Sequence, residues 1–249
     1  MRPTGATLQG CVVCVDDLTH LQREQMYSLL EAYFANVTRA GFEEDLAEKS
    51  WVCTVVDPGS DRIHGFSTLM RFEVRMDGEP VTVLFSGDTI VDRSYWGQQV
   101  MHRVMGRHML TLAEETPEAR TFWLLLSSGY KTYRFLPAFF VEFFPRYDAP
   151  TPFDMRRLTD TFADTKFGSQ YHKEAGVVRF ERPAPLRPGV AEIDNRRMRN
   201  PHIAFFLRAN PRHAAGDELV CIAELTRPNL TRAAHRMIGI SGPPRHLRT

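Results

Sequence analysis

One stretch, residues 81–112, constrains the fold more than any other part of the chain. Its first eleven residues are rich in β-branched and apolar side chains, which is typical of a strand. The pair Gly87-Asp88 interrupts this strand, and a glycine inside a strand pattern indicates a bulge or a close backbone approach. After a turn at residues 92–97, apolar residues recur at helical spacing. The sequence therefore predicts a bulged strand, a turn and an amphipathic helix in direct succession.

A helix that starts directly after a turn leaves backbone N–H groups without intrahelical acceptors. Together with the positive end of the helix dipole, these groups favour a phosphate or another anion. An ordinary connection between a strand and a helix has the same pattern. Spacing alone therefore leaves both interpretations open.

The run D-R-S-Y-W-G-Q-Q-V-M, residues 92–101, resembles the acyl-CoA pyrophosphate loop of the GNAT-type N-acyltransferases. That loop reads roughly Q/R-x-x-G-x-G/A and lies between a bulged strand and a helix, and Gly97 and Gln98 match its middle. Three positions depart from the usual form: Trp96, Gln99 and Met101. Because glycines let the backbone approach a pyrophosphate closely, we expect side chains at 99 and 101 to narrow that approach.

The order of predicted elements over residues 10–145 is similar to that of the same family. Strands are expected at 10–15, 51–56, 63–76, 81–91 and 120–127, and helices at about 21–37, 39–49, 100–112 and 130–140. The resemblance implies an α/β (α+β) fold of GNAT-like type. Its central sheet would be mixed, mostly antiparallel and flanked by helices.

The rest of the chain is expected to add to this core within a single domain, residues 1–249. Residues 146–200 are interrupted by prolines and are interpreted as an insertion, with a helix near 151–167 and a short strand at 177–180. Strands at 202–208 and 218–226 would form the family's closing hairpin, residues 202–226. A terminal helix and a tail would occupy residues 227–249.

Composition and charge are ordinary for a soluble globular protein, with 43% hydrophobic and 24% charged residues. No apolar run is long enough for a membrane helix, and the N-terminus lacks a signal-peptide pattern, so we expect a cytoplasmic protein. No metal is expected, because Cys11-x-x-Cys14 falls on a predicted strand and points to opposite faces. The net charge is +1, but the charge is uneven, and the part of the chain from Arg187 onward is basic. This part fits either an acidic partner, such as a carrier protein or nucleic acid, or a solvated surface.

The resemblance implies where the chemistry would lie. In GNAT-type enzymes the acyl thioester lies between two splayed parallel strands, here 82–91 and 121–127. A backbone hydrogen bond from the bulged strand stabilises the oxyanion, a carboxylate accepts the proton of the amine, and a tyrosine protonates the thiolate. These roles carry over to Asp88 as the base and Tyr133 as the acid, with Tyr130 as the alternative tyrosine. The competing interpretations are a structural aspartate at the bulge and a core tyrosine.

Contacts with the donor, an acyl-CoA or a phosphopantetheine-linked acyl group, are expected from a longer set of residues. This set comprises Ser86, Gly87, Val91, Trp96, Gly97, Gln98, Gln99, His102 and Arg103. The Phe-rich segment 135–144 is either core or an apolar wall for a long acyl chain. If the donor is an acyl carrier protein, its phosphate and acidic surface would meet a basic set: His102, Arg103, Arg107, Lys131 and Arg134.

The function expected on this basis is acyl transfer from a thioester to the amine of a small molecule. A binding protein that has lost catalysis, and decarboxylation or hydrolysis of a thioester, are the alternatives. The expected partners are the small-molecule amine, an acyl carrier protein and a second copy of the chain in a homodimer. A membrane or a nucleic acid is not expected.

Overall fold

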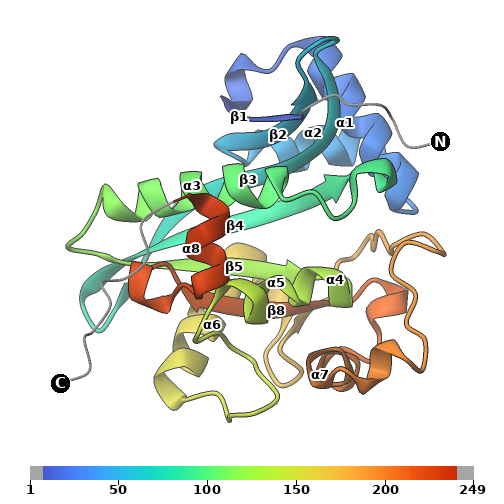
Figure 1. The fold of residues 1–249 in the computed structure, drawn as a ribbon. Helices are drawn as coiled ribbons and strands as arrows, with labels where there is room; N and C mark the ends of the chain where they lie inside the picture. The colour runs from blue at the N-terminus through green and yellow to red at the C-terminus, as the bar shows by residue number, and fades with distance from the viewer. Residues whose placement is uncertain (1–7, 240–249) are drawn as a thin grey trace.

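A computed structural model describes residues 8–239, which form one eight-stranded sheet covered by helices on both faces (Figure 1). The strands are β1 (Gln9–Cys14), β2 (Trp51–Asp57), β3 (Arg62–Met76), β4 (Glu79–Val91), β5 (Arg120–Ser127), β6 (Tyr171–His172), β7 (Val177–Val178) and β8 (Glu218–Glu224). Their order in the sheet is β1-β2-β3-β4-β5-β8-β7-β6. Only β4 and β5 pair in parallel among these described strands. The predicted mixed and mostly antiparallel sheet flanked by helices is confirmed.

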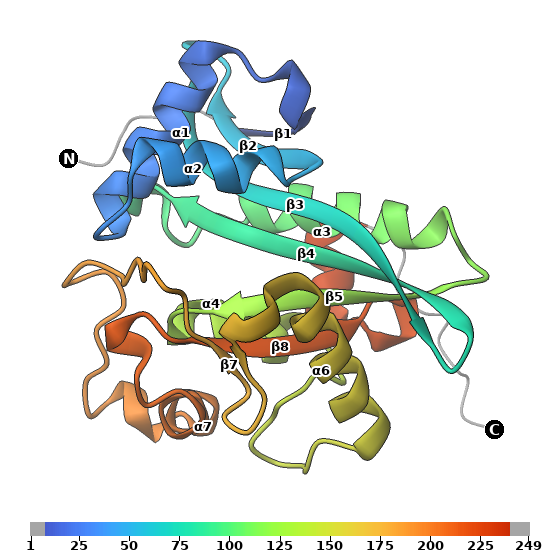
Figure 2. The same cartoon turned by 180° about the vertical axis from the view of Figure 1, so that it is seen from behind.

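The helices divide between the two faces of the sheet (Figures 1 and 2). One face carries α3 (Val100–Glu114), α4 (Tyr130–Tyr133), α5 (Phe135–Phe139), α7 (Pro201–Ala209) and α8 (Arg232–Ile238). The other carries α1 (His20–Tyr33), α2 (Arg39–Ala47) and α6 (Phe153–Phe167).

Helix α3 shows how the sequence pattern becomes packing. Met101, Met105 and Met109 recur every four residues and are at most 6% exposed, so they form one buried stripe against the sheet. Burying each such side chain stabilises the fold by roughly 1.5–3 kcal/mol. The side chain of Met101 thus points into the core. The prediction that this side chain narrows the approach of the loop backbone to a pyrophosphate is therefore wrong.

The bulge predicted at Gly87-Asp88 is present. In the β3–β4 ladder Ser67 faces Thr89 and Leu69 faces Ser86, so Thr68 alone opposes two residues of β4. A bulge of this kind disrupts the ladder locally and bends the strand. It places Asp88 at the bend.

The strand expected at 202–208 is wrong, because these residues lie in helix α7. Asn200 caps the helix: its side chain accepts hydrogen bonds from the N–H groups of His202 and Ile203, and Pro201 occupies the first turn. Ile203 and Phe206 are buried against α4. Local capping and tertiary packing together therefore override the strand-like composition.

The region interpreted as an insertion also contributes to the sheet. Strand β7 pairs with β8 through Val177↔Leu219 and Val178↔Glu218, and β6 pairs with β7 at the edge. The neighbour of β8 on this side is thus β7 and not residues 202–208. The terminal helix is confirmed as α8, whereas the predicted tail from residue 240 onward lies outside the described residues. Within residues 8–239 no helix has the length and apolar character needed to cross a bilayer.

Candidate active site

Strands β4 and β5 separate at their carboxyl ends. Their parallel pairing runs from Val81↔Arg120 to Ser86↔Leu125 and stops there. Beyond that point β4 continues to Val91 and β5 to Ser127 without pairing to each other. The separation begins at the bulge, so Gly87 and Asp88 are the first residues of β4 that β5 does not cover.

Gly87 is tightly packed on the face that carries α2 and α6. A Cβ atom at this position would lie 2.5 Å from Thr68 Oγ1 and 2.9 Å from Lys49 Cε. On the opposite face Ser86 is buried, and its Oγ accepts a hydrogen bond of 2.9 Å from Trp123 Nε1. The bulge is therefore held from both sides, and glycine is the residue that fits at position 87.

Three carboxylates gather near the bulge: Asp45, Asp88 and Glu218, here called the acidic cluster. Burial, followed by the charge of Asp45, raises the pKa of Asp88 to about 7, although Lys49 opposes the shift. Burial, followed by the charges of Asp88 and Asp45, raises the pKa of Glu218 to about 8. Asp88 therefore exchanges protons near neutral pH, as a general base requires.

Lys49 is the buried cation of this region. Its side chain is 0% exposed, and its Nζ donates to Asp45 Oδ1 at 2.5 Å and to the Asp45 backbone oxygen at 3.0 Å. The Nζ also lies 5.6 Å from the centre of the Phe85 ring. Asp45 thereby compensates Lys49, and Asp88 and Glu218 remain the carboxylates that lack a dedicated cation.

The loop between β4 and α3 is a tight turn with an exposed tryptophan. The Asp92 side chain accepts from the Ser94 N–H, Gly97 has φ +95°, and α3 starts without a side-chain cap. The Trp96 Nε1 donates to the Val91 oxygen at 2.7 Å. The first amides of α3 therefore lack intrahelical acceptors, as the sequence predicts.

Two cations lie on Trp96. Lys131 Nζ is 3.4 Å from the ring centre and Arg93 Cζ is 5.0 Å from it, which are cation–π distances. Burial, then the charges of Arg197 and Arg93, lowers the pKa of Lys131. This positive cluster, Arg93 with Lys131, stands next to the start of α3 and suits an anion.

A proline-rich segment, residues 183–193, runs past the ends of β4 and β5 between α1 and α7 (Figure 2, orange). Arg93 donates to the Gly189 oxygen at 2.6 Å, and Lys131 donates to the Val190 oxygen at 2.6 Å. A Cβ at Gly129 would come within 2.9 Å of Leu186 Cδ1. The segment therefore covers the region next to the point where β4 and β5 separate.

The tyrosine preferred from the sequence does not lie with the other site residues. Tyr133 is 0% exposed among Phe143, Phe205 and Phe206, and its hydroxyl donates to the Pro145 oxygen at 2.9 Å. Burial raises its pKa further above the ordinary range. Tyr130 is also mostly buried, at 4% exposure, and it starts α4 directly after β5. Tyr130 is the tyrosine nearer in sequence to the end of β5.

His102 and Arg103 point away from the loop. The His102 ring packs against Phe135 and Phe139, with centroids 4.5 Å and 5.5 Å away, and burial lowers its pKa. Arg103 donates to the Met237 oxygen at 3.0 Å, and Arg107 donates to the Ile238 oxygen. The two arginines thus hold the C-terminus of α8, where carbonyls attract cations.

Much of the Phe-rich segment is divided between the core and an apolar pocket. Phe135, Phe139 and Phe140 line this pocket together with residues of α3 and α8, and its volume is about 40 Å³. Phe143 is buried against Tyr133. The present volume holds no long acyl chain, so the segment acts as core in this conformation.

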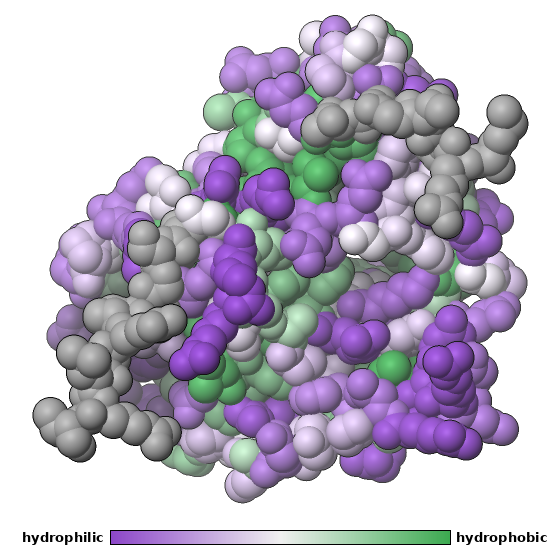
Figure 3. Space-filling view, in the orientation of Figure 1, coloured by the Kyte–Doolittle hydropathy of each residue, from purple (hydrophilic) through white to green (hydrophobic). Residues whose placement is uncertain are grey.

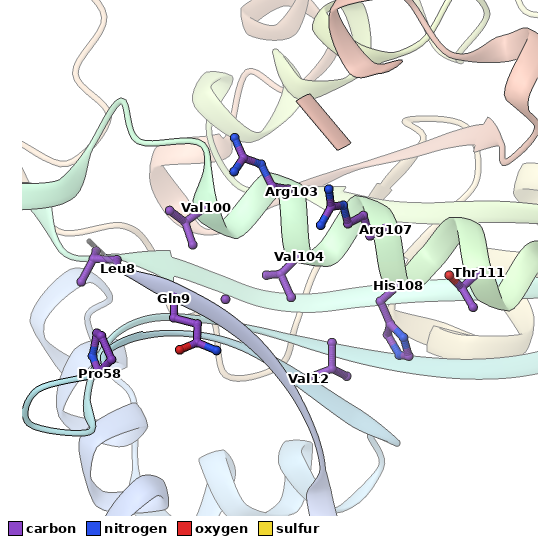
Figure 4. A pocket seen from close by; sticks show the side chains of 11 residues that line it. Leu8, Gln9, Val12, Pro58, Val100, Arg103, Val104, Arg107, His108 and Thr111 are labelled. Carbon is purple, nitrogen blue, oxygen red and sulfur yellow. The ribbon is translucent and has the colours of Figure 1, made fainter. Parts of the chain in front are cut away.

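A larger groove of about 610 Å³ lies between β1 and α3 (Figure 4). Its floor is formed by Gly10 and Val104, while the guanidinium groups of Arg103 and Arg107 turn toward α8. Apolar side chains gather on the surface in this area (Figure 3). The groove is on the α3 face and is lined by none of the acidic cluster.

Four residues of the site are absent from the expectations drawn from the sequence: Asp45, Lys49, Thr68 and Glu218. Glu218 lies 130 positions after Asp88, and only the neighbouring order β4-β5-β8 brings the two together. Lys49 is one of four lysines in a chain whose other cations are arginines, which is a weak signal. In the described part of the chain, no three His, Cys, Asp or Glu side chains are grouped as a metal site would require.

No protein-family model and no curated protein matches this chain. Similar solved structures include a GCN5-related N-acetyltransferase from Kribbella flavida, with TM-score 0.40 and 16% identity over 55% of this chain and 34% of that one. A probable N-acyltransferase from Enterococcus faecalis gives TM-score 0.39 and 14% identity over 51% of this chain and 31% of the other.

The GNAT-family N-acetyltransferase YhbS from Escherichia coli, solved with CoA, gives TM-score 0.39 and 18% identity. The match covers 55% of this chain and 71% of that one. The chain spans only about a third of the Kribbella and Enterococcus proteins. At these identities and TM-scores the likeness identifies neither a donor nor an acceptor for this chain.

Proposed function

We propose that this chain transfers an acyl group from a thioester, with acyl-CoA as the first candidate, to the amine of a small molecule. The observation that carries the proposal is the separation of the parallel pair β4 and β5 at a bulge that holds Asp88. A flat thioester can enter such a separation, and the disrupted ladder offers backbone N–H groups to its carbonyl oxygen.

The donor would approach from the face that carries α3 and α4. Its phosphate would meet the first amides of α3 together with Arg93 and Lys131, which lie on Trp96. Each of these cations keeps further N–H donors after its bond to the proline-rich segment. His102, Arg103 and Arg107 would not take part, because the core and α8 occupy them.

The acceptor would approach from the opposite face, where the acidic cluster lies. Asp88 takes one proton from the ammonium group, and the neutral nitrogen attacks the thioester carbon. The C–S bond of the tetrahedral intermediate then breaks, and the thiolate takes a proton from Tyr130 or from water. The nitrogen gives up its second proton, which restores the one that Tyr130 or water donated. The products are the amide, the free thiol and protonated Asp88, so atoms and charge balance.

The proposal is tested by the binding of donors to the purified protein. The panel holds acetyl-CoA, a long-chain acyl-CoA and an acylated carrier protein, and thermal shift and calorimetry give the affinities. A ligand that binds only the native state at about 100 times its Kd stabilises that state by roughly 2.7 kcal/mol. We expect one donor to bind and Lys131→Met to weaken it about tenfold or more.

Lys173→Met serves as the matched control, because Lys173 is exposed and pairs with Asp160 away from the loop. Release of thiol is then followed with and without added amines, and the products are identified by mass spectrometry. Release without an amide product would indicate hydrolysis or decarboxylation instead. If no donor in the panel binds, the chain is a binding protein on this fold and the proposal fails.

A further inference from the structure

Strand β1 is an unprotected edge of the sheet. Within residues 8–239 it pairs with β2 alone, and its sequence, Q-G-C-V-V-C, contains neither a charged residue nor a proline. Edge strands of monomeric proteins commonly carry such residues, because they prevent pairing with another chain. The opposite edge, β6, has two residues and is followed directly by Lys173 and Glu174. Of the two edges, β1 is therefore the one that remains open to pairing.

The free hydrogen-bonding groups of β1 follow from its register with β2. The Val15 N–H donates to the Ser50 oxygen at 3.1 Å, and this pair continues the register of the two strands. In an antiparallel ladder, hydrogen-bonded pairs alternate with pairs whose N–H and C=O groups point to the other side. The odd-numbered residues of β1 therefore bond to β2. The N–H and C=O groups of Gly10, Val12 and Cys14 point outward from the edge of the sheet.

The groove of about 610 Å³ between β1 and α3 accompanies this edge. Val12 is 38% exposed and points into the groove from β1, while Val104 and His108 point into it from α3 (Figure 4). Burial lowers the pKa of His108, which keeps its ring neutral at about pH 7. The guanidinium groups of Arg103 and Arg107 turn toward α8. The side of α3 that faces the groove therefore presents uncharged groups to a neighbour.

We propose that β1 pairs antiparallel with β1 of a second copy of this chain, about a twofold axis at Val12. In this register Val12 lies opposite Val12 of the second copy, and Gly10 lies opposite Cys14. All three residues with outward-pointing groups then form hydrogen-bonded pairs, and the two sheets become one continuous sheet. The axis is perpendicular to the sheet, so the face that carries α3 is the same face in both copies.

A second copy fits this edge better than an unrelated peptide does. Helix α3 lies directly on β1, since a Cβ at Gly10 would come within 2.8 Å of Val104 Cβ. The two α3 helices therefore come side by side across the axis, and the uncharged walls of both grooves face each other. A peptide would bring no such second wall. Because the same patch is used twice, one contact covers both open edges and closes the assembly at two chains.

The mass of the purified chain in solution tests the pairing. Sedimentation is measured at about 50 µM, roughly fifty times a Kd of about 1 µM. We expect nearly twice the mass of one chain for the wild type. The variant Val12→Glu places two like charges opposite each other at the axis, so it should have the mass of one chain. Val141→Glu, in the loop after α5 and 54% exposed, is the matched control and should remain a dimer.

A disulfide tests the register in a second, independent way. In a background with Cys11→Ser and Cys14→Ser, the variant Val12→Cys places two thiols opposite each other, and the other two cysteines are buried. Opposite residues of a hydrogen-bonded pair have Cα atoms about 5.5 Å apart, which a disulfide spans. We expect mild oxidation to give a covalent dimer. Gln9→Cys in the same background is also exposed, but it lies opposite Val15 of the second copy and should cross-link at least about tenfold more slowly.

Each result either supports or overturns the pairing. A wild-type chain with the mass of a single copy overturns it, as does a dimer that persists in Val12→Glu. Equal rates of cross-linking at positions 9 and 12 also overturn it. If Val12→Glu fails to fold, the two cysteine variants decide alone. Neither experiment uses a thioester or an amine, so the inference stands or fails separately from the proposed function.

Discussion

At the scale of single residues, the site depends on an unusual contact at Gly87. At this point one residue of β3 lies opposite two residues of β4. Lys49 and Thr68 fill the space that a side chain at position 87 would need. Lys49 is fully buried at this point, so it has little freedom to move aside. The bulge, the buried Lys49 and the hydroxyl of Thr68, which has no hydrogen-bond partner, are thus parts of one arrangement.

Gly87→Ala should therefore be destabilising. The added methyl group would lie 2.5 Å from Thr68 Oγ1 and 2.9 Å from Lys49 Cε, and overpacking of this kind costs about 1–3 kcal/mol. Chemical denaturation measures the loss. Gly59→Ala is the control, since its nearest neighbour would be 3.4 Å away, and an equal loss in both variants would show that the bulge is not tightly packed.

The residue scale also shows what could be predicted from the sequence. The position of Asp88 followed from a glycine inside a strand pattern, which is a local signal. Glu218 could not be found in this way, because its proximity to Asp88 depends on which strand neighbours β5. The preference for Tyr133 was not supported by packing, since burial of a tyrosine on a four-residue helix has no local signature.

At the scale of elements, the strands and helices up to residue 140 match the expectations closely. Strand β5 has the predicted bounds, and α3 begins at the predicted residue, because periodicity and turn residues agree over these segments. The exception is α7, where six apolar residues in nine resemble a strand. The decisive signal is the pair Asn200-Pro201, in which a capping side chain is followed by a proline in the first turn of the helix.

Asn200→Ala tests the importance of this cap. Its side chain accepts hydrogen bonds from two backbone N–H groups, and loss of such a cap costs about 1 kcal/mol. The midpoint of denaturation should therefore fall, while Asn200→Ser retains most of the stability. Asn195→Ala, in an exposed turn, should have no effect; a similar drop there would argue against a specific capping role.

At the scale of the whole molecule, the acidic cluster links the stability of the fold to pH. Asp88 and Glu218 have folded-state pKa values of about 7 and about 8, both above those of the unfolded chain. The folded state thus holds more protons than the unfolded state between about pH 4 and pH 8. Their contribution is complete below this window and is lost as the pH rises through it.

Glu218→Gln should consequently stabilise the protein at alkaline pH. The gain over wild type should be near zero at about pH 4 and reach about 2 kcal/mol at about pH 9, since glutamine carries no charge to desolvate. For a chain of this size that corresponds to a Tm increase of roughly 4–8 °C. Melting curves across the pH range measure it, and a gain that does not depend on pH would contradict the assignment.

We propose that Asp88, at the point where β4 separates from β5, removes a proton from an amine that attacks a thioester. The direct measurement is thiol release from the bound donor at saturating amine, with donor affinity determined in parallel, for wild type and Asp88→Asn. We predict that kcat falls by about 10²–10⁴-fold in the variant while donor Kd changes less than about threefold. An unchanged kcat, or a wild type that binds a donor and forms no amide with any amine, would contradict it.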